Sequence, residues 1–336
     1  MDVVENARSL AGIAVIVLIA WLLSENKRQF PFLLLLGAVG VQLTLVLALF
    51  AIPNSNAVLQ AISAAVNGLA SATDRGVEFV FGHLAGRADS QPYPVEQPAY
   101  LFVFGFRVLP LILVISALSA LLWHWRILKW ITRGFGLVFQ RVMGLSGPAA
   151  LAVAANIFMG MVESPLVIRA YLERLSRAEL FLLMVVGFST VAGSTMVAYS
   201  VILQPVLTNA AGHVLVASII SAPAGVLLAR IMVPETERVE HAAGAGELKY
   251  ESSMDAVTRG VQDGVMVAVN VAAFLIVFVS FVWIIQYALT LLPLVEGEPL
   301  TLQRMFGYVF APVAYLIGVP WAEAQTGGAI LGTKLF

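Results

Sequence analysis

Glu163 is the residue best suited to chemistry, because it is the one acid in the apolar stretch between residues 146 and 168. Ser146 and Ser164 each precede a proline by one or two residues, a pattern typical of helix starts. The serine oxygen accepts hydrogen bonds from free N–H groups of the first turn, and proline fits there because no N–H partner is lost. We therefore expect two short helices that meet near Gly160. Each would hold about 11–12 residues and measure ~17 Å, whereas the hydrocarbon core of a bilayer is ~30 Å thick.

Both ends of this helix pair carry arginines, which places the two ends on the same side of a membrane. The expected structure is a re-entrant hairpin that brings Glu163 to the middle of the bilayer. That position costs an acid about 3 kcal/mol, so it indicates a cavity lined by protein in which the carboxylate binds substrate. The alternative is a surface position, where the dipole of the following helix favours an acid. The arginines are Arg141 before the pair and Arg169, Arg174 and Arg177 after it.

The composition is that of an integral membrane protein. Of 336 residues, 60% are apolar and only 12% are charged, and the mean hydropathy is +0.91, whereas about 25% of residues are charged in soluble domains. The net charge of −1 and the lack of a basic tract give no indication of nucleic-acid binding. The chain has no cysteine, which excludes disulfides and thiol chemistry. Its first residues lack the basic region of a signal peptide, so the first apolar run is expected to remain as a span.

Apolar runs long enough to cross a bilayer occur six times. They cover residues 9–23, 31–52, 105–123, 180–203, 206–233 and 264–292. Between them, residues 53–103 are expected to form interfacial helices, and residues 234–262 a polar segment that is partly helical. Residues 302–321 are expected to form a short interfacial helix. A further helix begins at residue 322 and stops at Phe336 without a cap, so we expect the sequence to be truncated there.

Basic residues set the expected orientation. Lys27 and Arg28 lie in the first loop, and residues 124–141 carry four bases and no acid. Both loops are therefore expected in the cytoplasm by the positive-inside rule. This orientation puts the N-terminus outside, and it makes the hairpin with Glu163 enter from the cytoplasm.

The run 180–203 has small and hydroxyl residues in its middle, between Gly187 and Thr195. Such residues commonly allow close helix packing. The alternative is a broken helix whose free carbonyls face an ion or substrate, as in transporters with discontinuous helices. The preceding hairpin favours the broken helix.

Other candidate sites are weak. The four histidines lack the spacing of metal ligands, and no phosphate-binding loop or activated serine is present. Gln42 and Asn270 lie within spans, where amides usually bond to neighbouring helices. The histidines are His83, His124, His213 and His241.

The segment from Asn156 to Leu166 resembles the tip of the first hairpin in the concentrative nucleoside transporters, which usually reads Gly-Gln-Thr/Ser-Glu-Ala-Pro-Leu. Further matches follow in family order, and together they cover about residues 100–336. They are Glu179-Leu-Phe, Val191-Ala-Gly-Ser, Asp263-Gly, Asn270-Val-Ala-Ala, Gly307-Tyr-Val-Phe-Ala-Pro, Gly318-Val-Pro-Trp and Leu331-Gly-Thr-Lys.

The resemblance implies an all-α integral membrane protein of the inverted-repeat type, with a re-entrant hairpin and a discontinuous helix. It implies a homotrimer in the cytoplasmic (inner) membrane that imports nucleosides with a proton or sodium gradient, and it implies no enzyme activity. On this basis residues 1–104 hold N-terminal spans and interfacial helices, and 105–141 the third span with its basic loop. Residues 142–233 are the first transport repeat, and 234–336 hold a cytoplasmic segment, a scaffold span, an interfacial helix and the start of a second hairpin.

The resemblance also implies a set of ligands. Nucleobase ligands map onto Met161, Val162 and Glu163. Sodium ligands map onto Asn156, the carbonyl of Met159, Thr190 and Val191. The family's ribose ligands correspond to positions beyond Phe336.

Two positions depart from the family. Met161 replaces the usual glutamine, so it offers the base no amide and can only pack against its ring. Val162 replaces a hydroxyl residue and removes an oxygen that sodium would use. We therefore favour the proton as coupling ion, carried by Glu163, and keep sodium as the alternative.

Other classes of function stay open at this point. A passive nucleoside pore or a binding receptor would use the same substrate residues without gradient coupling. An intramembrane enzyme based on Glu163 is disfavoured because no second acid, histidine or metal cluster is found at matching depth.

Overall fold

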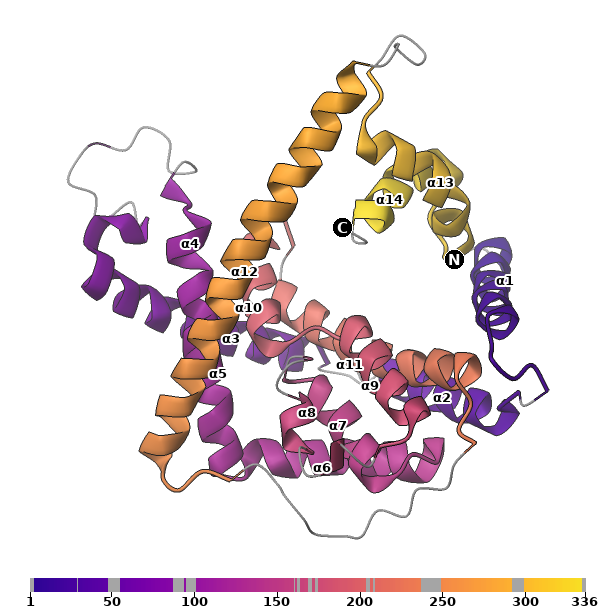
Figure 1. Ribbon diagram of the computed structural model, residues 1–336, viewed down its shortest axis with the longest axis horizontal. Helices are drawn as coiled ribbons and strands as arrows, with labels where there is room; N and C mark the ends of the chain where they lie inside the picture. The colour runs from indigo at the N-terminus through magenta and orange to yellow at the C-terminus, as the bar shows by residue number, and fades with distance from the viewer. Residues whose placement is uncertain are drawn as a thin grey trace. The chain divides into compact units, whose positions relative to one another are not determined.

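All regular structure in the described part of the chain is helical, as the resemblance to the family implied (Figure 1). The computed structural model divides into two compact units, Ser24–Val269 and a second unit of Met1–Leu23 with Asn270–Phe336. The described residues are 3–28, 30–47, 55–86, 94, 101–159, 161, 164–168, 171–172, 175–203, 206–207, 209–236, 249–291 and 299–333.

The larger unit holds most of the helices and the first half of α12. Their bounds are α2 Phe32–Val46, α3 Ser55–Phe81, the 3-10 helix η2 Gly82–Ala85, α4 Phe104–Arg107, α5 Leu109–His124, α6 Ile127–Met143, α7 Gly147–Asn156, α8 Ser164–Val167, α9 Arg177–Ser189, α10 Gly193–Leu203, α11 Ala210–Met232 and α12 Ser253–Thr290.

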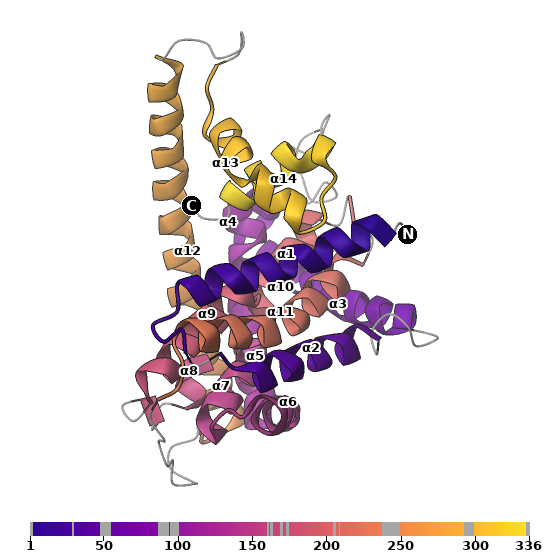
Figure 2. The same cartoon turned by 90° about the vertical axis from the view of Figure 1, so that its right-hand side faces the viewer.

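The core of this unit is built around α11, which packs against α2 and α9 (Figures 1 and 2). Gln42 of α2 donates its amide N–H to the carbonyl of Ile220, 3.0 Å away, which confirms the predicted role of Gln42 between helices. Gly225 lets α9 approach closely, because a Cβ at this position would lie 2.5 Å from Ser189 Oγ.

Helices α7 and α8 occupy the region of the predicted hairpin, whose tip includes residues outside the described ranges. Ser146 caps α7 by accepting a hydrogen bond from the Ala149 N–H at 3.3 Å, as its spacing to proline predicted. Ser164 at the start of α8 donates to the carbonyl of Ala152 at 2.6 Å and thereby holds the two arms together. Both arms are shorter than predicted. Helix α7 ends at Asn156 rather than near Gly160, and α8 spans only Ser164–Val167.

The run 180–203 is a broken helix, as the small and hydroxyl residues in its middle and the preceding hairpin predicted. Helix α9 ends at Ser189 and α10 begins at Gly193. A capping box stabilises the start of α9, in which Ser176 accepts from the Glu179 N–H and the Glu179 carboxylate accepts from the Ser176 N–H.

Three helices in the described ranges are long and apolar enough to cross a bilayer: Phe104–His124, Ala210–Met232 and Ser253–Thr290. The last begins 11 residues before the predicted span at 264. The polar residues before it are also helical, supported by an ion pair of 2.8 Å between Arg259 and Asp255 one turn apart.

Helix α2 covers only part of the predicted span 31–52. Its 15 residues measure about 22 Å, which is shorter than the ~30 Å hydrocarbon core. The remainder of that span, from residue 48, lies outside the described residues.

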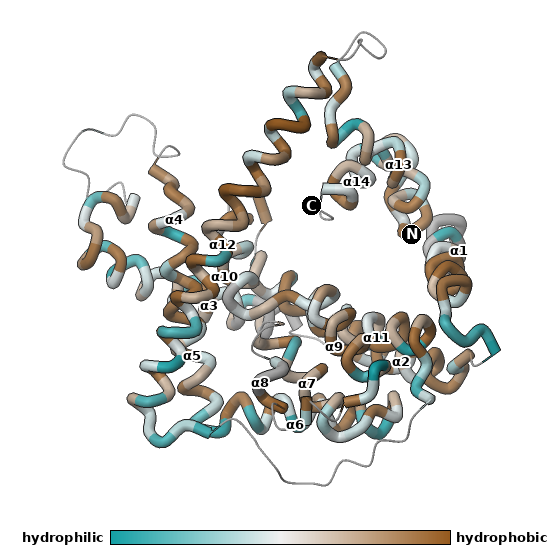
Figure 3. The backbone as a smooth tube through the Cα atoms, in the orientation of Figure 1, coloured by the Kyte–Doolittle hydropathy of each residue, from teal (hydrophilic) through white to brown (hydrophobic). Residues whose placement is uncertain are grey.

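Helices α5 and α12 approach closely through two glycines. A Cβ at Gly260 would lie 2.7 Å from the Cα of Ala117, and one at Gly264 would lie 2.8 Å from the Cα of Leu113. Small residues at this spacing are typical of tightly packed membrane helices. The second half of α12 is apolar and exposed (Figure 3).

The smaller unit contains α1 (Val3–Leu22), the rest of α12, α13 (Leu302–Leu316) and α14 (Trp321–Thr333). Helices α13 and α14 form a pair bent by 116°. Arg8 of α1 donates to the carbonyl of Gly318 at 2.7 Å, within the bend. In the larger unit, a connection that contains Gly144 joins α6 to α7. In the smaller unit, a connection that contains Gly318 joins α13 to α14, and both glycines have positive φ.

Candidate functional site

The hairpin turn after α7 and the break between α9 and α10 lie side by side in the larger unit. The Gly193 N–H donates to the carbonyl of Phe158 at 3.1 Å. A Cβ at Gly193 would lie 2.7 Å from that carbonyl oxygen, so only glycine fits this contact. The pairing also explains why α7 ends early, because Phe158 turns its carbonyl toward the break instead of continuing the helix.

Asn156 is the buried polar group of this region. It is the last residue of α7 and is 2% exposed. Its Oδ1 is buried and accepts no hydrogen bond from the described part of the chain. A buried acceptor without a donor is rare and indicates an ion or water in the functional state.

The helix ends strengthen this indication. Both α7 and α9 point their C-terminal ends at the region, through Asn156 and Ser189. The C-terminal end of a helix carries partial negative charge, which favours a cation. Free carbonyls at such ends are the groups with which broken-helix transporters bind their coupling ions.

The other predicted cation ligands lie in the same two segments. Met159 is buried in the hairpin turn. Thr190 and Val191 lie in the helix break, where the Thr190 hydroxyl donates to the carbonyl of Val186 at 2.9 Å and keeps its lone pairs as acceptors. The structure thus brings together the segments that carry all four predicted cation ligands.

The predicted nucleobase ligands are less completely defined. Met161 is half exposed (51%). Its backbone approaches α9 at Gly187, where a Cβ would lie 2.8 Å from the Cβ of Met161. Val162 and Glu163 lie outside the described residues, so their roles stay predictions.

A polar network that the sequence analysis did not predict holds the base of the hairpin. Ser146 Oγ donates to Glu179, and Ser176 Oγ donates to Glu235 at 2.9 Å. Arg230 near the end of α11 donates to the same carboxylate at 2.6 Å. These bonds join the starts of α7 and α9 to the end of α11.

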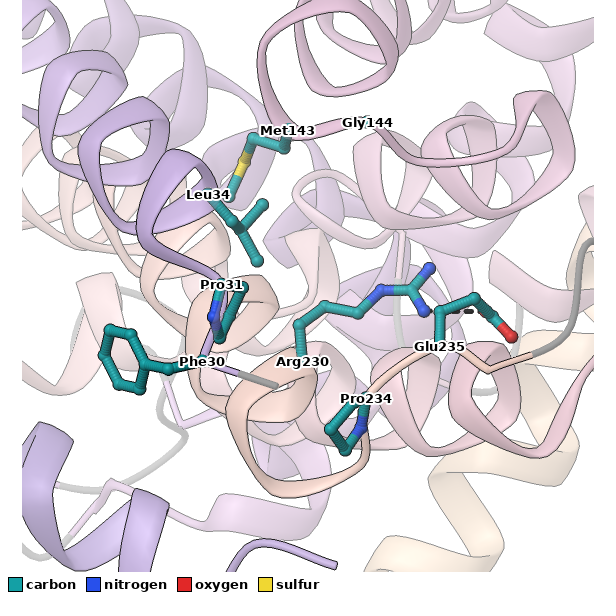
Figure 4. A pocket seen from close by; sticks show the side chains of 8 residues that line it. All are labelled: Phe30, Pro31, Leu34, Met143, Gly144, Arg230, Pro234 and Glu235. Carbon is teal, nitrogen blue, oxygen red and sulfur yellow. Dashed lines mark hydrogen bonds and ion pairs between the residues drawn. The ribbon is translucent and has the colours of Figure 1, made fainter. Parts of the chain in front are cut away.

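A cavity of about 320 Å³ lies beside this network (Figure 4). In the figure the Arg230 guanidinium points toward the Glu235 carboxylate. No predicted ligand lines it, and its walls are mainly apolar, so it is separate from the candidate site. The lining residues are Phe30, Pro31, Leu34, Met143, Gly144, Arg230, Pro234 and Glu235. No group of three or more His, Asp or Glu able to hold a metal occurs among the described residues.

Three family models match successive parts of the chain. They are described as Na⁺ dependent nucleoside transporter N-terminus (residues 11–84), nucleoside recognition "Gate" (105–206) and Na⁺ dependent nucleoside transporter C-terminus (213–336). Over 331 residues the chain is 34% identical to the uncharacterized transporter YutK of Bacillus subtilis, covering 97% of this chain and 78% of YutK. The chain belongs to the concentrative nucleoside transporter family.

A named relative and solved structures agree with this assignment. This concentrative nucleoside transporter is 32% identical to the nucleoside permease NupC of Helicobacter pylori, over 97% of this chain and 76% of NupC. It is similar to the inward-facing, substrate-bound structure of CNTnw, with a TM-score of 0.87 and 33% identity over 98% of this chain and 76% of that one. An outward-facing variant of CNTnw gives a TM-score of 0.88. The predicted family and all-helical transporter fold are confirmed, and the family is one of transporters rather than enzymes.

Sequence reasoning missed Ser218 of α11, which bonds to both segments of the site. The Val191 N–H donates to Ser218 Oγ at 3.1 Å, and the carbonyl of Ile157 lies 3.4 Å from the same oxygen. A hydroxyl in the middle of the apolar run 206–233 is the signal that could have found it.

Proposed function

We propose that this transporter imports nucleosides across the cytoplasmic membrane by symport with a cation that binds between the hairpin turn and the helix break. The observation that carries the proposal is the Oδ1 of Asn156, which is buried beside two helix C-termini and has no donor within the described ranges. A bound cation would satisfy this oxygen and the partial negative charge around it.

Two cations are candidates. Sodium is favoured by the buried Asn156 oxygen, by Thr190 and Val191 beside it, and by the description of the matching family models as Na⁺ dependent. The proton is favoured by Val162, which takes away a hydroxyl oxygen, and by Glu163, which could carry the proton. We propose sodium as the coupling ion and the proton as the alternative.

Substrate is proposed to bind beside the cation. Glu163 would bind the nucleobase by hydrogen bonds, and Met161, half exposed, would pack against its ring. Because the hairpin carries the substrate ligands and two of the cation ligands, Asn156 and Met159, binding of the cation would favour the conformation of the hairpin that binds the base. Each ligand would then raise the affinity for the other.

Assembly and orientation complete the proposal. The exposed apolar residues along the second half of α12 fit contact with lipid or with other protomers of a homotrimer. The N-terminus would lie outside and the basic loops inside, so that the hairpin enters from the cytoplasm.

Uptake into proteoliposomes tests gradient coupling. The full-length protein is reconstituted, and radiolabelled nucleoside is offered with and without an inward cation gradient. We expect the nucleoside to accumulate above its external concentration only while the gradient lasts. Equilibration without accumulation would instead identify a passive pore, and saturable binding without entry would identify a receptor.

A further inference from the structure

Ser218 has an unusual set of contacts for a serine inside a helix. A buried serine or threonine in a helix ordinarily donates to a carbonyl one turn earlier, as Ser200 does to Met196 at 2.7 Å and Thr132 does to Leu128 at 2.9 Å. The hydroxyl of Ser218 is directed away from its own helix and toward residues 27 and 61 positions earlier in the chain. It is 2% exposed.

The contacts of Ser218 reach both halves of the candidate cation site. Its Oγ accepts from the Val191 N–H at 3.1 Å and therefore orients the peptide between Thr190 and Val191. Two carbonyl oxygens lie within reach of its single O–H, that of Ile157 at 3.4 Å and that of Val191 at 3.5 Å. A hydroxyl has one hydrogen, so it donates to one of these carbonyls at a time.

We propose that Ser218 is a positioning residue for the coupling cation, acting through the backbone of Val191. Its bond to the Val191 N–H holds the helix break in the conformation that presents its carbonyls. Its hydrogen can move from the Val191 carbonyl to the Ile157 carbonyl. The Val191 oxygen is then released to the cation without leaving the hydroxyl unsatisfied.

This inference rests on the proposed cation site and makes it more specific. Ser218 lies on α11, whereas the predicted ligands all lie in the hairpin and the break. The cation affinity is therefore set by three segments, of which α11 contributes no ligand. Because the hydrogen bonds of Ser218 within the described ranges go to Val191 and Ile157, we expect its effect on the cation and not on the nucleoside.

The test compares four variants with the parent protein in proteoliposomes. Ser218→Ala removes the hydroxyl. Ser218→Thr and Ser218→Val form a pair of nearly equal volume, of which only threonine keeps a hydroxyl. Ser200→Ala is the matched control, since it removes a buried serine whose bond stays within its own helix.

Three quantities are measured for each protein: the sodium concentration for half-maximal uptake, the KM for nucleoside at saturating sodium, and the rise in Tm when sodium replaces choline. We expect Ser218→Ala and Ser218→Val to raise the half-maximal sodium concentration about three- to tenfold, which corresponds to the binding free energy lost with one hydrogen bond. The same two variants should lose much of the sodium-dependent rise in Tm. Ser218→Thr, Ser200→Ala and every nucleoside KM should stay near the parent values.

An unchanged sodium constant in both Ser218→Ala and Ser218→Val would overturn the inference, and so would an equal rise in the nucleoside KM or the same loss in Ser200→Ala. Should Ser218→Ala fail to fold, the threonine and valine pair gives the answer alone. The response of the parent protein to sodium distinguishes a failure of the proposed sodium coupling from a failure of the proposed role of Ser218. If the parent's uptake and Tm do not respond to sodium, then sodium coupling itself is wrong. A parent that responds to sodium, with Ser218 variants that respond in the same way, removes only the role of Ser218.

Discussion

At the scale of single residues, the proposed role of Asn156 in cation binding has a consequence for stability. An acceptor that is buried without a donor destabilises a fold by about 1–3 kcal/mol. Asn156 at the end of α7 is 2% exposed, so its unpaired oxygen lowers the free energy of unfolding when no ligand is bound. A polar group kept at such a cost is expected to act in binding.

Asn156→Ala is expected to weaken cation binding without unfolding the protein. The half-maximal sodium concentration should rise at least tenfold, while the Tm in sodium-free buffer stays the same or increases, since the unsatisfied oxygen is gone. Gln42→Ala is the control, because this amide already bonds to Ile220. It should lower Tm and leave the sodium constant unchanged; a fall in Tm for Asn156→Ala with no change in the sodium constant would contradict the proposed role.

Glu163→Gln is expected to abolish nucleoside uptake or to reduce it more than tenfold. The amide cannot accept hydrogen bonds from the base with both of its polar atoms, and it cannot carry a proton. Assembly, measured by native mass spectrometry, should be unaffected. Uptake at the parent rate would remove Glu163 from the site.

At the scale of the elements, the site depends on one backbone contact between the hairpin turn and the helix break. The Gly193 N–H and the Phe158 carbonyl form it at 3.1 Å. Helix α11 supports it from Ser218 and through its close packing on α9 at Gly225. The long helix α11 thus contacts both the hairpin turn and the helix break.

Gly193→Ala is expected to reduce uptake at least tenfold, because the new methyl group would lie 2.7 Å from the Phe158 oxygen and force the break away from the hairpin. Gly134→Ala on α6 is the control, since a Cβ there meets no atom within 4 Å. The two variants are compared by uptake and by Tm. Equal activity of both would show that the contact does not hold the site.

Much of this arrangement could be predicted from the sequence, because it depends on local signals. Ser146 with its proline predicts the start of α7, and the small residues around Gly193 predict a broken helix. The early end of α7 and the contacts of Ser218 could not be predicted, since they depend on bonds between residues 27 to 61 positions apart. The start of α12 lies in the segment 234–262 that was predicted to be partly helical, but its continuity with the apolar span was not predicted, because ion pairs such as Arg259–Asp255 support a helix beyond its apolar part.

At the scale of the whole molecule, the expected orientation in the membrane follows from the positive charge of the loops. The cysteine-free sequence allows single cysteines to be introduced at chosen positions. A cysteine in place of Arg133 should be labelled by a membrane-impermeant thiol reagent only after cells are opened, because this basic segment is predicted to be cytoplasmic. Labelling from outside intact cells would reverse the orientation and the direction from which the hairpin enters.

The coupling of the whole transport cycle to sodium is the central claim. It is tested most directly by nucleoside uptake into proteoliposomes at equal pH on both sides, with a protonophore present to collapse any proton gradient. An inward sodium gradient is then imposed or replaced by choline. We predict that the nucleoside accumulates with sodium and not with choline. The contradicting result is accumulation that is the same with sodium and with choline, and that follows an imposed pH gradient once the protonophore is omitted. It would exclude the proposed sodium site at Asn156 and identify the proton as the coupling ion.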